Sequence, residues 1–273
     1  MELWLIAVFV ATGALAGTLA GLMGIGGGIL YVPVLVYSLE QAGLPDAQIP
    51  LVAVSTSLAV ILASLGNSLA AHWKNGNIDF SPLLGLVLGG ALGALLASLA
   101  LKELSADPFK ILLGSFELFM ALKLLKGSQK NDAVTQGRRG LLVFAGIGFA
   151  GGLLSAFFGV GGGLIVMPLL HFVSAYPIAK AVGTTTGFML FAAAAALGSH
   201  GLQADPSTQL TGLWHAFYLP GFFALLPSAF IFNRVGANLA HRTDPKRLKR
   251  WFGWFILPLG LLNGLGGLWA WLG

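Results

Sequence analysis

The sequence predicts an all-α, polytopic helical membrane protein made of two inverted repeats, each with a glycine-broken helix or a re-entrant hairpin. Composition is the first observation: 56% of the 273 residues are hydrophobic and 9% are charged, whereas a soluble domain carries about 25% charged residues. The second is a series of apolar stretches of hydrocarbon length, which form helices because a bilayer offers the backbone no other hydrogen-bond partners. The third is a glycine-rich motif that occurs twice.

The repeated motif interrupts apolar sequence at matching places in the two halves of the chain. Residues 23–33 read Met-Gly-Ile-Gly-Gly-Gly-Ile-Leu-Tyr-Val-Pro, and residues 158–168 read Phe-Gly-Val-Gly-Gly-Gly-Leu-Ile-Val-Met-Pro. Each glycine costs a helix about 1 kcal/mol relative to alanine, so the run predicts a break. Broken helices in corresponding places of two repeats are typical of a transporter's binding site.

The remaining elements follow the same order in both halves. A long apolar helix leads to the break, a short helix follows, and three further spans complete the half. Asp107-Pro108 and Asp244-Pro245 precede the last spans, where aspartate caps a helix and proline suits its first turn. The predicted helices are 3–23, a short piece to about 38, 51–73, 82–101 and 108–126, then 141–158, a short piece to about 173, 178–200, 211–233 and 248–272.

A polar, basic segment separates the halves. We therefore divide the chain into a first transmembrane repeat, 1–126, a linker, 127–140, and a second transmembrane repeat, 141–273. The first apolar stretch follows Glu2 without a preceding lysine or arginine. A signal peptide begins with basic residues, so we interpret this stretch as a retained span.

The positions of lysine and arginine distinguish two topologies. If each glycine break lay within one continuous crossing, six of these residues would face one side and nine the other. If each break is a hairpin, thirteen share one side and only Lys102 and Lys110 lie opposite. Cytoplasmic loops are rich in lysine and arginine. The hairpin is therefore favoured, with a cytoplasmic linker, both termini outside the cell (inner) membrane, and the halves inverted relative to each other.

The glycine breaks are the first candidate binding residues. A new helix begins after each break, and its free N–H groups and positive dipole end attract an anion without a buried cation. The alternative is that the glycines only allow helices to cross closely. The short helices of about 12–15 residues reach roughly 18–22 Å, less than a ~30 Å hydrocarbon core, so we expect the turns inside the membrane. The candidates are Gly26, Gly27, Gly28, Gly161, Gly162 and Gly163.

Two hydroxyl clusters, Ser55-Thr56-Ser57 and Thr184-Thr185-Thr186, occupy matching helices and are the second set of candidates. Hydroxyl groups can donate to the oxygens of an oxyanion, although they can equally bond backbone carbonyls or a neighbouring helix. Asn67 is a weaker candidate for the same role. Gly183 stands where the first half has Ser55, so the site is not strictly symmetric. His72 and His200 follow the central threonines by sixteen residues, at span ends where we expect them to be solvated.

Glu117 lies near the middle of the predicted span 108–126 and is a candidate for proton coupling. An intramembrane carboxylate is a functional hypothesis by default, and the alternative is a neutral carboxyl group bonded to a neighbour. The histidines show no metal-ligand spacing, and neither a catalytic triad nor a carboxylate pair is present in the sequence. We therefore predict no enzyme activity, metal or cofactor, and no nucleic acid as a partner.

With its doubled Gly-Leu-Met-Gly-Ile-Gly-Gly-Gly…Pro and Ala-Phe-Phe-Gly-Val-Gly-Gly-Gly…Pro motifs, the chain resembles the TauE/SafE family over nearly its whole length. The resemblance implies export of sulfite or of organosulfonates such as sulfoacetate. The family positions present are Gly26–Gly28, Pro33, Gly161–Gly163 and Pro168.

The expected function is secondary transport of a small sulfur-containing anion by alternating access, driven by protons. The alternatives are a passive anion channel and a transporter of another small anion; an intramembrane enzyme or assembly factor is disfavoured. The expected partners are the anion and the lipid bilayer, and association into a homodimer is left open by the sequence.

Overall fold

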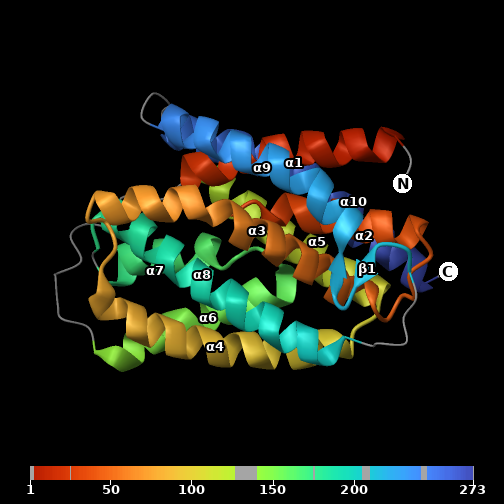
Figure 1. The fold of residues 1–273 in the computed structure, drawn as a ribbon, viewed down its shortest axis with the longest axis horizontal. Coiled ribbons are helices and arrows are strands. Elements are labelled where there is room, and N and C mark those ends of the chain that lie inside the picture. Colours follow the sequence, from red (N-terminus) through yellow and green to blue (C-terminus); the bar gives the residue numbers. More distant parts are fainter. Residues whose placement is uncertain are drawn as a thin grey trace.

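The computed structural model describes residues 3–24, 26–126, 140–174, 176–204, 210–240 and 245–272, with only the backbone described at a few helical positions. These ranges form ten helices and one short hairpin (Figure 1). The predicted linker, 127–140, lies outside the described residues except for Gly140. The elements are α1 Leu3–Met23, α2 Gly28–Gln41, α3 Ile49–Lys74, α4 Phe80–Lys102, α5 Ala106–Lys126, α6 Leu141–Phe158, α7 Gly163–Ser174, α8 Ile178–Gln203, β1 Leu213–Trp214, β2 Phe217–Tyr218, α9 Leu219–Ala240 and α10 Pro245–Leu272.

The helices have the length and composition of membrane spans. Among the described residues, seven are long and apolar enough to cross a bilayer, namely α1, α3, α4, α6, α8, α9 and α10. Large apolar side chains cover the outside of the bundle, for example Leu88, Leu92 and Leu99 on α4, as expected of helices that face lipid rather than water. The prediction of an all-α polytopic membrane protein is confirmed.

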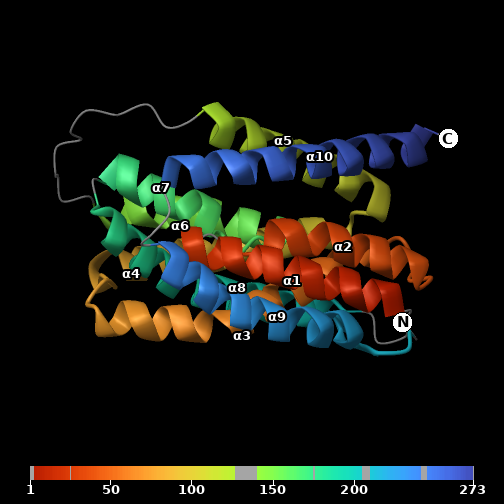
Figure 2. The same ribbon diagram turned by 90° about the horizontal axis from the view of Figure 1, so that it is seen from above.

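The chain turns back at each glycine break. In Figures 1 and 2, α1 runs away from the end of the bundle where both termini lie, and α2 returns toward it. In the second half, α6 runs away from the opposite end and α7 returns to that end. With 14 and 12 residues, α2 and α7 are about 21 and 18 Å long, so each ends short of a full crossing. We call the two ends of the bundle the termini face and the linker face.

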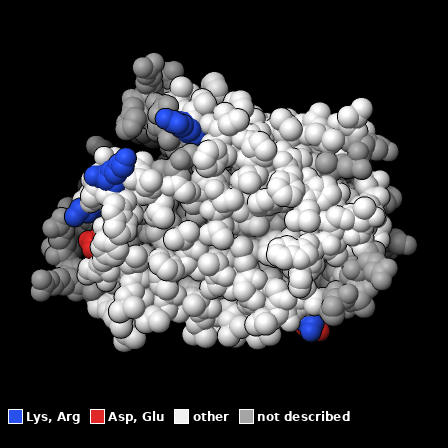
Figure 3. All heavy atoms as spheres, in the orientation of Figure 1, with Lys and Arg blue, Asp and Glu red and all other residues white. Residues whose placement is uncertain are grey.

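Basic residues gather at the linker face. Figure 3 shows lysine and arginine concentrated at that end, with little basic surface visible at the other. The prediction that the chain forms hairpins rests on this asymmetry, and the path of the helices agrees with it.

The two halves interlock. The first helix of each half packs most extensively against the fourth helix of the other, α1 against α9 and α6 against α4, while α5 packs against α10 and α3 against α8. Small residues make the crossings close: a Cβ on Gly89 would overlap the backbone of Ala145, and one on Gly17 the backbone of Ala229. Each helix of one half thus packs against the same partner in the other half as its own counterpart does. This reciprocal pairing relates the inverted halves by an approximate two-fold axis in the plane of the membrane.

One predicted span begins at the wrong residue. The sequence prediction placed a helix over 211–233, but α9 begins at Leu219, and the β1–β2 hairpin precedes it. Gly212 has a φ of +86°, a conformation that ends regular structure and favours glycine. Pro220 lies in the first turn of α9, where its missing N–H group is not needed. That proline was the signal in the sequence for the true start.

Candidate functional site

The two glycine breaks meet at the centre of the bundle. Gly28 lies so close to Gly159 that a Cβ on Gly28 would overlap the carbonyl oxygen of Gly159. A Cβ on Gly26 would lie 3.0 Å from the carbonyl oxygen of Val160. The glycines are therefore needed for the backbones to touch, in addition to the left-handed conformations that several of them adopt. Those with positive φ are Gly24 (+66°), Gly26 (+75°), Gly159 (+66°), Gly161 (+78°) and Gly162 (+74°).

Two helix N-termini converge on this meeting point from opposite directions. The first intrahelical bonds run from Leu30 N to Gly27 O at 3.0 Å in α2 and from Ile165 N to Gly162 O at 3.2 Å in α7, and Tyr31 N and Val166 N donate to the same two oxygens. The N–H groups before Leu30 and Ile165 have no acceptor within their own helix. Because each N-terminus also carries the positive end of the helix dipole, the two helices place partial positive charge at the centre of the bundle, where the described residues of the two breaks include no lysine or arginine.

An apolar pair packs against both breaks. Ile61 in α3 and Met189 in α8 are related by the same 128-residue offset as the central threonines Thr56 and Thr184. A Cβ on Gly161 would lie 2.9 Å from Met189 Cε and 3.4 Å from Ile61 Cδ1. Both side chains are buried. They fill the middle of the bundle at the point where the two-fold relation places equivalent residues side by side.

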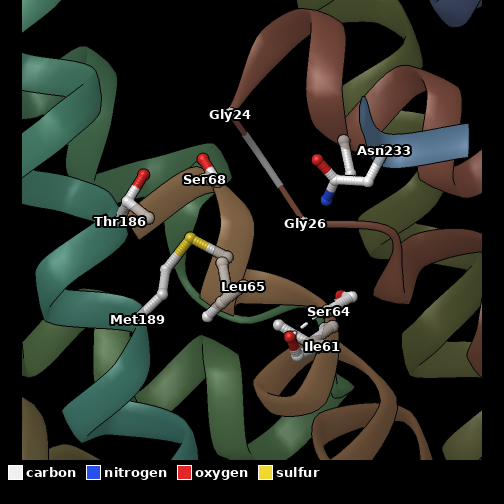
Figure 4. A pocket seen from close by; sticks show the side chains of 10 residues that line it. Gly24, Gly26, Ile61, Ser64, Leu65, Ser68, Thr186, Met189 and Asn233 are labelled. Carbon is white, nitrogen blue, oxygen red and sulfur yellow. Dashed lines mark hydrogen bonds between the residues drawn. The ribbon is translucent and has the colours of Figure 1, made fainter. Parts of the chain in front are cut away.

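A small polar cavity, the central cavity, lies beside this pair in the half of the bundle nearer the linker face (Figure 4). Its volume is about 10 Å³, room for roughly one water molecule. Asn233 from α9 points toward the first glycine break, and Thr186 and Ser68 lie on the facing helices. The lining residues are Ala20, Gly24, Gly26, Ile61, Ser64, Leu65, Ser68, Thr186, Met189 and Asn233.

The polar lining is not repeated on the other side of the two-fold axis. A 128-residue offset relates α3 to α8, and a 139-residue offset relates Asp79 at the start of α4 to Tyr218 at the start of α9. These offsets place an alanine or a leucine at the position equivalent to each of the four polar lining residues, and these four apolar side chains are buried. At these four positions the bundle is therefore packed with apolar side chains on the side toward the termini face. The equivalent pairs are Ser64 and Ala192, Ser68 and Ala196, Thr186 and Leu58, and Asn233 and Ala94.

The central threonines of the two hydroxyl clusters join the halves together. Thr56 Oγ1 accepts a hydrogen bond from the backbone N–H of Tyr218 at 3.0 Å and donates to the Val52 carbonyl at 2.7 Å. Thr184 Oγ1 accepts from the backbone N–H of Asp79 at 2.9 Å. Each threonine thus binds the start of a helix in the other half, which gives it a structural partner in the state described.

The other hydroxyls have different surroundings. Ser57 Oγ donates to the carbonyl oxygen of Gly159 at 2.8 Å and so holds the second break in place. Thr185 is buried with no hydrogen-bond partner among the described residues. Thr186 donates to the Val182 carbonyl at 2.9 Å and also lines the central cavity. Of the six hydroxyl candidates, the structure brings only Thr186 to that cavity.

His200 does not lie in solvent, so that expectation is wrong. Helix α8 continues to Gln203, which places His200 inside the bundle with none of its surface exposed. Its Nδ1 is 2.9 Å from Ser55 Oγ. This contact joins α3 to α8 on the side of their crossing that faces the termini face. Its counterpart cannot form in the same way, because Gly183 replaces the serine in the second half.

Glu117 lies away from the central cavity. It is fully buried between α5 and α10, where Asn263 Nδ2 donates to its Oε2 at 2.8 Å. Its neighbour Phe116 stacks on Phe158, with ring centroids 4.5 Å apart, and Phe158 directly precedes the second glycine break. Figure 2 shows α5 and α10 side by side along one flank of the bundle. The proposed role of Glu117 in proton coupling stays a prediction.

Several lining residues were not anticipated. Asn67 was a candidate, but its side chain lies outside the described residues; the structure instead brings Ser64 and Ser68, on either side of it in α3, to the cavity. Their spacing of one helical turn on an otherwise apolar helix was a usable signal. Asn233 is a buried amide in an apolar span, which is a functional hypothesis for the same reason as a buried charge.

Comparison with known proteins agrees with this architecture. A model of the sulfite exporter TauE/SafE family matches residues 9–262. Among curated proteins, the probable membrane transporter protein YunE of Bacillus subtilis is 25% identical over 259 residues, covering 88% of this chain and 90% of YunE. A probable membrane transporter protein of Haemophilus influenzae is 27% identical over 251 residues, covering 91% and 94%.

A third relative comes from an archaeon. The probable membrane transporter protein MJ0441 of Methanocaldococcus jannaschii is 25% identical over 260 residues, covering 95% of both chains. No solved structure matches the chain significantly. A family match over most of the sequence, together with relatives that align over most of both chains, carries the assignment. The chain belongs to the sulfite exporter TauE/SafE family of membrane transporters.

Proposed function

We propose that the protein is a secondary transporter that exports sulfite or a small organosulfonate across the inner membrane. The observation that carries the proposal is the meeting of two opposed helix N-termini at the glycine breaks, beside a cavity lined by neutral polar side chains. The name of the matching family describes a sulfite exporter, and the curated relatives are named membrane transporters, so we propose no catalytic reaction.

The donors at the centre suit an oxyanion. Backbone N–H groups at the start of α2 and α7 can bind oxygens, as helix N-termini do elsewhere. Ser68 offers a hydroxyl and Asn233 offers an amide. In the state described, the hydroxyls of Thr186 and Ser64 donate to the carbonyls of Val182 and Ile61, so they would have to rotate to donate to an anion. The described lining contains no lysine or arginine. A site without a fixed cation binds an anion weakly enough to release it, which a transporter requires as much as binding itself.

The direction of opening follows from charge and symmetry. If the basic linker face is cytoplasmic, as the distribution of lysine and arginine indicates, the polar central cavity lies on the cytoplasmic side of the Ile61–Met189 pair. At about 10 Å³ the cavity is closed around no more than a water-sized space. We propose that loading widens it toward the linker face, and that an exchange of conformations between the inverted halves then opens the termini face.

Proton coupling can be tested through Glu117. In Glu117→Gln the amide oxygen can still accept the bond from Asn263, so the packing of α5 on α10 is kept while the titratable group is lost. We expect flux driven by an imposed proton gradient to fall at least about tenfold, and equilibrium exchange of anion to persist. Glu103→Gln, which changes an exposed carboxylate at the end of α4, is the matched control and leaves both rates unchanged.

A passive channel is the alternative that the same variant distinguishes. A channel needs no titratable coupling residue, so full gradient-driven flux in Glu117→Gln would favour it. The substrate itself is tested by reconstituting only this protein in liposomes and measuring flux of sulfite, sulfoacetate, taurine, thiosulfate and sulfate. We expect sulfite or an organosulfonate to move fastest. Absence of flux for both classes, with transport of another anion, would overturn the assigned substrate.

A further inference from the structure

A second and larger cavity lies at the termini face. Its volume is about 190 Å³, and a cavity of roughly 150 Å³ is large enough to bind benzene. It therefore has room for a small organic anion, which the central cavity in this state does not. Loop residues before α3, the ends of α4 and α8, and the β1–β2 turn surround it. The lining residues are Ala47, Gln48, Leu51, Val52, Lys102, Gln203, Ala204, His215 and Ala216.

Lys102 supplies positive charge where the protein has very little. Lys110 is the other basic residue at the termini face, and its Nζ is bound to Glu40 at 2.7 Å and to Asp107 at 2.8 Å. Lys102 forms no ion pair with any described residue. Its ammonium group beside the cavity attracts an anion over a distance of about 10 Å at ordinary salt concentration. Acidic side chains, among them the exposed Asp46 and Glu103, lie at the same end of the molecule.

His215 is held at the cavity by a strained turn. It is the first residue of the two-residue turn between β1 and β2, and its φ is +54°, the only positive φ of a non-glycine residue in the described chain. Glycine is strongly preferred in such turns. A bulky residue kept in this conformation points to a function for its side chain. The imidazole ring offers N–H donors to the same space as the Lys102 ammonium group.

Gln203 completes the polar lining. Its Nε2 donates to the Ser199 carbonyl at 3.2 Å and lies 3.3 Å from Ser199 Oγ. Its Oε1 is buried and has no hydrogen-bond partner among the described residues. The cavity therefore combines two donors, Lys102 and His215, with one unpartnered acceptor, Gln203 Oε1. This combination suits an anion that also carries a hydrogen-bond donor, as hydrogen sulfite or an aminosulfonate does.

The cavity lies on the route from the centre to the termini face. Val52 lines it, and the Val52 carbonyl accepts the hydrogen bond of Thr56. Gln203 lies one turn beyond His200, whose bond to Ser55 closes the α3–α8 crossing directly beneath. The Ser55–His200 pair therefore separates the larger cavity from the centre of the bundle.

We infer that the Lys102–Gln203–His215 cavity is an anion-binding site on the termini face, where a small oxyanion is held between the closed centre and the outside. The site deepens the proposed function and rests on it for the direction of travel: in export, this is where the anion is bound before release. Binding itself depends only on the charge and donors of the cavity.

The test is a binding titration on the full chain in lipid nanodiscs, with sulfite, sulfate and phosphate as probes. Lys102→Gln and His215→Gly are each expected to weaken binding roughly tenfold or more, the effect of one lost charge-assisted hydrogen bond. Glycine is favoured at position 215, so His215→Gly removes the imidazole without straining the turn. Lys123→Gln, an exposed change at the linker face, is the matched control with unchanged affinity.

Trp214 provides a local signal. Its ring centroid lies 5.3 Å from that of His215, so anion binding in the cavity should change tryptophan fluorescence, and Trp214→Phe should remove that change. Unchanged affinity for all three anions in both Lys102→Gln and His215→Gly would overturn the inference, even if sulfite is transported. Binding of sulfate or phosphate that depends on Lys102 would support it, even if liposome flux showed the proposed substrate to be wrong.

Discussion

Alanine in place of Gly28 is expected to reduce transport by about 100-fold while the protein still inserts in the membrane. The added methyl group would overlap the carbonyl oxygen of Gly159, and backbone atoms on both sides leave nothing flexible to move aside. Overpacking of this kind costs about 1–3 kcal/mol, and 3 kcal/mol corresponds to roughly 100-fold in rate. The measurement is initial flux in proteoliposomes, normalised to the amount of folded protein.

Gly66→Ala is the matched control for that variant. Gly66 lies in α3 between the cavity residues Ser64 and Ser68, but a Cβ there would meet nothing within 4 Å. The change gains roughly 0.5–1 kcal/mol of helix stability and should leave flux at the level of the original protein. Full flux in Gly28→Ala would show that transport does not require the two breaks to touch, and the proposed site would then be abandoned.

The second large effect is expected from the polar residues of the central cavity. Asn233→Leu and Thr186→Val keep approximate size and remove one polar group each from the cavity lining. A hydrogen bond to a charged ligand contributes about 1.5–3 kcal/mol, so each variant should raise the half-saturation concentration for the transported anion by roughly 10- to 100-fold. Asn233 forms no hydrogen bond with the described residues, so its loss should leave the thermal stability nearly unchanged.

Thr56→Val separates binding from folding. Thr56 is another buried hydroxyl in the same bundle, but it accepts from Tyr218 N and does not line the cavity. Its removal leaves a buried N–H group without a partner, which costs about 1–3 kcal/mol. We expect a lower melting temperature and a normal half-saturation concentration. If Asn233→Leu also showed a normal half-saturation concentration, the substrate would have to bind elsewhere.

Local sequence was sufficient to predict the helices and their breaks. Hydropathy and length defined the spans, and residues 3–23 and 141–158 are helical as predicted. The glycine runs predicted the interruptions because three glycines weaken any helix. The count of lysine and arginine selected the hairpin topology, since a continuous path would have distributed charge evenly. Hydropathy and the glycine runs depend only on residues near one another in the chain, and the charge count needs only the order of the spans.

The composition of the site could not be derived in the same way. Ser57 binds Gly159 across 102 residues, and Thr56 binds Tyr218 across 162. These contacts depend on how the inverted halves interlock, and a matched pair of hydroxyl clusters looks the same whether it binds substrate or backbone. Asn233 became a candidate only when α9 placed it opposite Thr186. The β1–β2 turn was missed because its apolar strands resemble the start of a span.

The most direct test of the account is the sidedness of Lys126 and Lys180. The chain contains no cysteine, so single cysteines can be introduced at these exposed positions, and at Gln41 and Glu103, without removing native thiols. They are labelled in intact cells with a membrane-impermeant maleimide. If the chain doubles back at both glycine breaks, positions 41 and 103 react from outside, and 126 and 180 react only after the membrane is opened. Labelling that places 126 and 180 on opposite sides would mean an unbroken crossing at the second break, and would contradict the account.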